Sequence, residues 1–136
     1  MAKYVVTSQS VTINSVDLSD ACARAELVLN SAEVETTDFG SAGWTEVIGG
    51  LKSGALTMDF HSDFGVAGVS TTFQDLIGTV VTFEVIAGGT TASATTPAYS
   101  GSILISSFTP VAGAVGDLAT FSVTFPTTGE VTYAVV

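Results

Sequence analysis

Apolar and polar residues alternate with a period of two through most of the chain. The clearest stretch is 54–60, in which Leu56, Met58 and Phe60 fall on one side and Asp59 falls on the other. The same period marks segments 23–29, 33–37, 79–86, 99–108, 118–125 and 130–135. Because successive side chains of a strand point to opposite faces, this pattern predicts short strands that each bury one face.

One segment, 70–77, has helical rather than strand spacing. Phe73, Leu76 and Ile77 stand at positions i, i+3 and i+4, and Ser70 is a residue type that caps a first turn. Many short strands with a single short helix predict a mostly β fold, which we interpret as an antiparallel β-sandwich or barrel-like domain.

The alternation stops in segment 37–52, which four glycines punctuate. A loop of this length is uncommon inside a compact domain and is usually functional or disordered. Its apolar content argues against disorder, so we predict a loop that packs on something. Trp44 within it has two interpretations that the sequence leaves open. It is either an anchor for another chain or a core residue that pins the loop to its own domain.

The composition fits one domain over residues 1–136, part of whose surface contacts other protein chains. Hydrophobic residues make up 46% of the chain, which excludes a disordered polypeptide, and charged residues make up only 12%. That charged share is about half the usual one for soluble domains. We therefore expect other protein chains to cover part of the surface.

The few charges are strongly unbalanced. Three basic residues stand against 13 acidic ones, giving a net charge of -10. Binding to nucleic acid through phosphates needs clustered Lys and Arg, and anionic membranes need the same, so both classes of partner are disfavoured. An alternative explanation is that the acids only keep an apolar chain soluble.

Candidate chemistry is sparse. His61 is the single histidine and has Ser62 and Asp63 beside it, but adjacent strand residues point to opposite faces and so do not form a triad. Cys22 is the single cysteine, so no internal disulfide forms, and no Cys/His spacing suits zinc. We expect no enzyme activity, no metal and no cofactor.

The N-terminal segment and the apolar runs of the chain indicate where the protein is made. The N-terminal residues lack the apolar stretch of a signal peptide, and no apolar run approaches the ~20 residues of a membrane span. We therefore expect a protein made in the cytoplasm.

Several short motifs, taken in their order along the chain, resemble those of a known protein family. These motifs are Asp38-Phe39-Gly40, the run Gly50-Leu51-Lys52-Ser53-Gly54 after Trp44, Phe60-His61-Ser62-Asp63-Phe64, Tyr99-Ser100-Gly101 and Gly116-Asp117-Leu118-Ala119-Thr120-Phe121-Ser122-Val123. As a set, over nearly the whole chain, they resemble the major tail (tail tube) protein of phages with long non-contractile tails. The resemblance implies the tail tube fold, with the short helix at about 70–77 and the long loop at about 37–52.

The same resemblance implies a structural role. Tail tube subunits form rings, usually hexameric, that stack into a hollow tube, and double-stranded DNA passes through the lumen without specific binding. The long loop contacts the next ring, and by position its contact residues are Phe39, Trp44, Val47, Ile48, Leu51 and Lys52. The expected partners are other copies of the chain and the tape measure, tail terminator and tip proteins. The expected location is the virion tail, assembled in the cytoplasm of a bacterial host.

The polar faces of the best strands supply candidates for the channel wall. Asp59 and Glu84, and then Glu26, each lie opposite apolar neighbours, so their side chains must meet water. Acids that face the channel would repel a DNA duplex, so these three are the candidates for the lumen. The sequence leaves open whether each meets the water of the channel or the water outside.

Two other classes of function stay open on the sequence alone. One is a different β-sandwich of a virion or cell surface, such as a capsid decoration protein or a carbohydrate-binding module. A sugar binder would need exposed aromatic residues on one face. The other, which we regard as remote, is a hydrolase that depends on His61.

Overall fold

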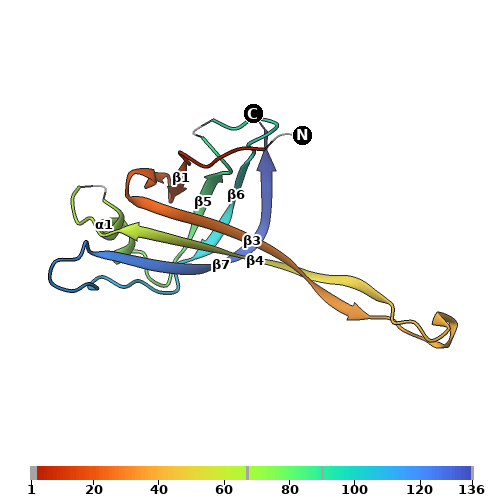
Figure 1. Ribbon diagram of the computed structural model, residues 1–136. Coiled ribbons are helices and arrows are strands. Elements are labelled where there is room, and N and C mark those ends of the chain that lie inside the picture. Colours follow the sequence, from red (N-terminus) through yellow and green to blue (C-terminus); the bar gives the residue numbers. More distant parts are fainter. Residues whose placement is uncertain (1–2, 67, 90, 136) are drawn as a thin grey trace.

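The computed structural model describes residues 3–66, 68–89 and 91–135. Their strands form one continuous seven-stranded sheet that folds at one strand into two packed halves, which we call the two sheets (Figure 1). The strands of this part of the chain are β1 (Val11–Ile13), β2 (Val16–Asp17), β3 (Cys22–Glu35), β4 (Val47–His61), β5 (Val80–Ile86), β6 (Ala98–Leu104) and β7 (Thr120–Ala134). They lie in the order β2-β1-β5-β6-β7-β4-β3, and each neighbouring pair is antiparallel. The predicted mostly β, antiparallel sandwich is confirmed.

Strand β7 forms the corner between the two sheets. Its first half, 120–126, pairs with β4, and its second half, 127–134, pairs with β6. The sequence pattern predicted separate strands at 118–125 and 130–135, with Pro126 and Gly129 between them. This was wrong, because β7 is one continuous strand that changes partners in this region. Proline lacks an N–H and is tolerated where β7 changes partners, while Gly129 adopts φ +81°, a left-handed conformation that favours glycine.

The core lies between the two sheets and follows the predicted alternation. Strand β4 contributes Leu56, Met58 and Phe60, all of which are buried. The other strands and the helix contribute their own inward residues: Val11, Ile13, Val81, Phe83, Val85, Ile103, Phe121, Val123, Phe125, Val69 and Phe73. Both sheets bury their apolar faces in this shared core. Their polar faces therefore point outward, in two different directions.

Helix α1 (Val69–Gln74) closes one end of the core. It is shorter than the predicted segment 70–77, and Gly68 rather than Ser70 occupies the N-cap position. Ser70 is buried inside the first turn, where its hydroxyl accepts a hydrogen bond from the N–H of Asp63 and ties the helix to the end of β4. Phe73 is fully buried, and its ring centroid lies 5.6 Å from that of Phe60.

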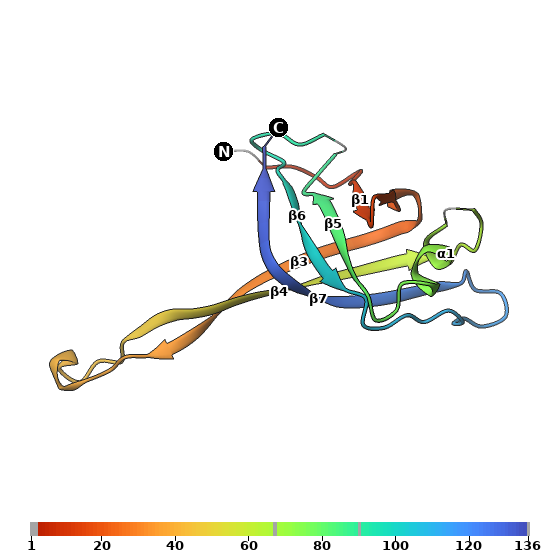
Figure 2. The ribbon, with the colours of Figure 1, turned by 180° about the vertical axis from the view of Figure 1, so that it is seen from behind.

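The predicted loop 37–52 is too long at its C-terminal end, because residues 47–52 belong to strand β4. Strand β4 already begins at Val47, and β3 continues unbroken to Glu35, so the two strands form one long hairpin that projects from the body (Figures 1 and 2). Only residues 36–46 connect them, including the short 3-10 helix η2 (Phe39–Ser41). Alternation fails as a signal here because neither face of the projecting hairpin is buried in its own chain.

Candidate assembly surface

The projecting hairpin, which we call the arm (residues 29–54), is the most distinctive feature of the molecule. Ala55 is the β4 residue closest to the arm that still pairs with β7, so within the arm β4 pairs only with β3. The arm extends away from both chain termini and from the helical end of the body (Figures 1 and 2). A two-stranded ribbon without further packing is marginally stable by itself, so contact with other protein would stabilise it.

Large apolar side chains on the arm are exposed. Trp44 is 78% exposed and Leu51 is 87% exposed, which excludes the core role considered for Trp44. The exposed large apolar residues of the arm are Leu29, Val34, Phe39, Trp44, Val47, Ile48 and Leu51. Soluble monomers seldom expose so many apolar residues on one segment, and such a segment marks an interaction surface.

The arm residues predicted to contact another ring do not share one face. Ile48 pairs with Val34, and a Cβ placed on Gly50 would lie 3.0 Å from Val34, so these three positions share one side of the ribbon. Lys52 pairs with Ser31 on the other side, which is the side continuous with the core face of β3. A partner that used all the predicted residues would therefore have to contact both sides of the arm.

The tip of the arm is an ordered turn. The hydroxyl of Ser41 accepts a hydrogen bond from the N–H of Asp38 (3.1 Å) and lies 3.3 Å from its carboxylate. The N–H of Trp44 donates to the carbonyl of Ser41 at 3.0 Å, and the N–H of Glu46 donates to the hydroxyl of Thr37 at 2.9 Å. These bonds hold Trp44 in place, so it is presented to a partner on a fixed turn.

Strand β3 presents a long free edge. It pairs with β4 on one side, and no strand of the described residues pairs with its other side. The strand has 14 residues, whereas β2, at the opposite end of the strand order, has only two. An unpaired edge of this length readily accepts another strand. Sequence reasoning missed this edge because pairing partners leave no local pattern.

The three predicted lumen acids lie on two different outer faces. Glu26 pairs with Thr57 and belongs, with Asp59, to the outer face of β3, β4 and the first half of β7. Glu84 pairs with Thr12 and Ser100 and belongs to the outer face of β1, β5 and β6. At most two of the three candidate acids, Glu26 and Asp59, can therefore line the same wall. Alternation identifies an outward position but not the sheet that carries it.

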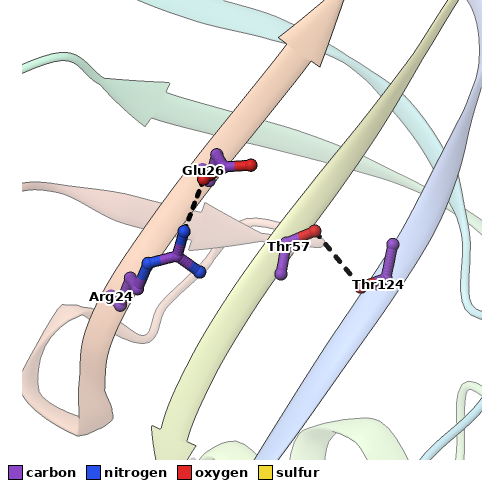
Figure 3. A network of polar contacts seen from close by, with 4 residues as sticks. All are labelled: Arg24, Glu26, Thr57 and Thr124. Carbon is purple, nitrogen blue, oxygen red and sulfur yellow. Dashed lines mark hydrogen bonds and ion pairs between the residues drawn. The ribbon is translucent and has the colours of Figure 1, made fainter.

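The first of these faces, which we call the β3–β4–β7 outer face, carries mainly polar side chains. Arg24 and Glu26 form an ion pair along β3, and the hydroxyls of Thr57 and Thr124 lie 3.2 Å apart between β4 and β7 (Figure 3). Arg24 also lies opposite Asp59 in the strand register. The guanidinium of Arg24 therefore lies near two carboxylates, those of Glu26 and Asp59.

The residues considered for catalysis are not assembled into a site. His61 is exposed at the end of β4, opposite Thr120. In the described ranges, no group of three or more His, Cys, Asp or Glu is placed to hold a metal ion, and no helix is long and apolar enough to cross a membrane. Burial raises the pKa of the Cys22 thiol, and the nearby charge of Asp59 raises it further, which opposes nucleophilic reactivity.

Comparison with solved structures shows which known proteins have the same fold. No family model matches the sequence, and no curated protein matches it significantly. A chain of the virion of a native gene transfer agent particle superposes with a TM-score of 0.76 at 15% identity, over 97% of this chain and 99% of that chain. A chain of the tail of an empty gene transfer agent particle, with C6 symmetry, superposes with a TM-score of 0.64 at 19% identity, over 84% and 82%. The protein thus has the fold of a gene transfer agent tail chain, which confirms the predicted tail tube resemblance at the level of the fold.

Proposed function

We propose that this protein is the subunit of a phage-type tail tube, in which copies form rings of six that stack along an axis. The observation that carries the proposal is the arm, a two-stranded projection whose large apolar side chains are exposed in the single chain. The sixfold symmetry is taken from the gene transfer agent tail, whose chain has the same fold.

The arm supports contact along the tube axis. Its apolar residues gain free energy only when another protein removes them from water. Because the arm extends well beyond the body, it reaches past its own ring toward the next one. The ordered turn that presents Trp44 reduces the entropy lost when the arm binds.

The free edge of β3 supports contact around the ring. Backbone N–H and C=O groups along this edge can pair with a strand of an adjacent copy, which satisfies them and joins neighbouring sheets. A heterologous contact of this kind, repeated by rotation, closes a ring. The low content of charged residues is consistent with a subunit whose surface is largely taken up by such contacts.

The wider role follows from the tube. The assembled protein is a structural part of the virion tail rather than an enzyme, and it is assembled in the bacterial cytoplasm with tape measure, terminator and tip proteins. Double-stranded DNA is delivered through its lumen. The net charge of -10 per chain supports passage without specific binding.

The single tryptophan provides a direct test. We expect purified protein to form rings or tubes with rising concentration, as seen by electron microscopy, and the fluorescence of Trp44 to shift to shorter wavelength as assembly buries it. The finding that the protein stays monomeric at high concentration and in phage lysates would contradict the proposal. Tubes that form with unchanged Trp44 emission would show that the arm tip is not at the interface.

A matched pair of variants isolates the arm. Ile48 on the arm and Val80 on β5 are each 58% exposed. We expect Ile48→Asp to fold normally but to lose assembly, because a carboxylate would be desolvated at the interface. Val80→Asp should fold and assemble. Equal assembly by both variants would contradict the role of the arm.

A second candidate, carbohydrate binding, has one observation in its favour. A hollow of about 560 Å³ at the arm tip is lined by Phe39 and Trp44 together with Thr37, Asp38 and Thr45. Aromatic faces beside hydrogen-bonding groups suit a sugar ring. Glycan-array binding by protein that does not self-assemble would favour this candidate over the tube.

A further inference from the structure

Two outer faces compete for the wall of the channel. The β3–β4–β7 outer face carries Glu26, Asp59 and Ser122, while the outer face of β1, β5 and β6 carries Thr82 and Glu84. Both sheets pack on one core, so their outer faces point in different directions and only one of them can face a common axis.

Continuity around the axis favours the sheet that contains β3. A channel wall made of joined sheets needs a strand edge long enough to pair with the neighbouring copy. Strand β3 offers 14 residues with an unpaired edge in the described structure. The other sheet ends in β2, which has two residues and leaves almost no edge to pair.

Continuity along the axis favours the same sheet. The arm is the direct extension of β3 and β4, so this sheet alone reaches beyond the body (Figure 1). A wall without gaps between stacked rings needs strands that bridge the junction, and β3 and β4 are long enough to do so.

The side chains of the β3–β4–β7 outer face suit the passage of DNA. Its centre consists of short hydroxyl side chains, Thr57, Ser122 and Thr124, which project little from the sheet. Arg24 is paired with Glu26 and lies opposite Asp59, so the charge of this group is net negative. Phosphates bind where Lys and Arg are free to replace counterions, and this face offers no such group among its described residues.

The competing face is less suited to the role. Each face has an exposed valine, Val80 here and Val28 on the β3–β4–β7 outer face. On this face, however, Ile86 and its partner Ala98 are already buried by the chain. This face is therefore uneven and partly covered.

We infer that the β3–β4–β7 outer face lines the tube, with Glu26 and Asp59 toward the DNA and Glu84 away from it. The inference rests on the proposed tube and adds the identity of the wall. Duplex DNA, an array of phosphates, slides along hydroxyl groups and carboxylates that do not retain it.

Reagents of two sizes test the assignment in assembled protein. Cys22 is first replaced in Cys22→Ser, and a new thiol is introduced either by Ser122→Cys on the proposed wall or by Thr82→Cys on the other face. Both positions are exposed in the single chain. A small maleimide enters the channel, whereas a maleimide coupled to a globular protein too wide for the channel does not.

The expected result is that the wide reagent labels both variants as dispersed subunits but labels only Thr82→Cys in tubes. The small reagent should label both in tubes. Labelling of Ser122→Cys tubes by the wide reagent, or shielding of Thr82→Cys from it, would overturn the assignment.

A second wall variant keeps the test decisive. If Ser122→Cys does not assemble, Thr124→Cys replaces it. Loss of assembly in both, with folded subunits, would place the face in a subunit contact and so also overturn the assignment. Failure of the unsubstituted protein to form rings or tubes would instead overturn the proposed function, which is a separate outcome.

Discussion

Thr57 of β4 and Thr124 of β7 lie directly opposite each other, and their hydroxyl oxygens are 3.2 Å apart (Figure 3). The pair occupies the centre of the β3–β4–β7 outer face, where neither side chain extends far from the sheet. The two hydroxyls are hydrogen-bond partners of each other. At its centre, the surface that we assign to the channel therefore has short side chains that are hydrogen-bonded to each other.

Replacement of Thr124 by lysine should make the channel bind DNA. In tubes of Thr124→Lys, each ring gains a circle of ammonium groups that can replace counterions on DNA. We expect short duplexes to be retained, to be protected from nuclease, and to be released as salt is raised. Filter binding with and without nuclease measures this effect. Thr82→Lys is the control, since DNA held on the outside would be digested; protection in both variants would contradict the assigned wall.

Removal of the Phe73 ring should strongly destabilise the fold. Its centroid lies 5.6 Å from that of Phe60 and 5.7 Å from that of Phe125, so the ring joins α1 to both β4 and β7. A buried Phe→Ala change typically costs about 3–5 kcal/mol. Urea denaturation of Phe73→Ala should show a loss of this size. Phe64→Ala, at an exposed position, should change the free energy of unfolding by less than about 0.5 kcal/mol.

The corner of β7 should depend on Gly129. At φ +81° an alanine is strained, and a left-handed conformation costs an L-residue roughly 1–2 kcal/mol. We expect Gly129→Ala to lower the midpoint of urea denaturation. Gly129→Asn should lower it less, because asparagine tolerates this conformation better. Equal midpoints for Gly129→Ala and the unsubstituted protein would mean that the bend does not need this conformation.

Stability should fall at alkaline pH through Cys22. Burial raises the pKa of its thiol in the folded state, with a further increase from the charge of Asp59 and an opposing effect from its hydrogen bond to the carbonyl of Arg24. A raised pKa means that the neutral thiol favours folding at pH values below the unfolded pKa. This contribution is lost as the pH rises through the folded value.

Thermal denaturation between pH 7 and 11 checks this effect against Cys22→Ser. The melting temperature of the unsubstituted protein should decrease more steeply above about pH 9, the ordinary pKa of a thiol. Tyrosine ionisation affects both proteins alike, so the difference between the two curves isolates the thiol. Parallel curves would show that Cys22 is not desolvated in the fold.

Local patterns in the sequence determined the parts of the fold in which one face is buried. Leu56, Met58 and Phe60 were assigned correctly to a core face because burial imposes alternation on a strand. The same patterns placed Asp59, Glu84 and Glu26 at outward positions. The scarcity of charged residues, by itself, indicated a surface that other chains cover.

Only the tertiary structure decided how these strands are joined. Residues 47–52 of the arm were assigned to a loop although they are strand, since neither face of the arm meets the core and alternation is not required there. Pro126 and Gly129 looked like a strand end, but β7 continues because a new partner, β6, takes over beyond the bend. The separation of Glu84 from Glu26 likewise depends on which strands pair. Strand pairing joins residues that are far apart in the chain. The local alternation of side chains therefore does not predict which strands pair.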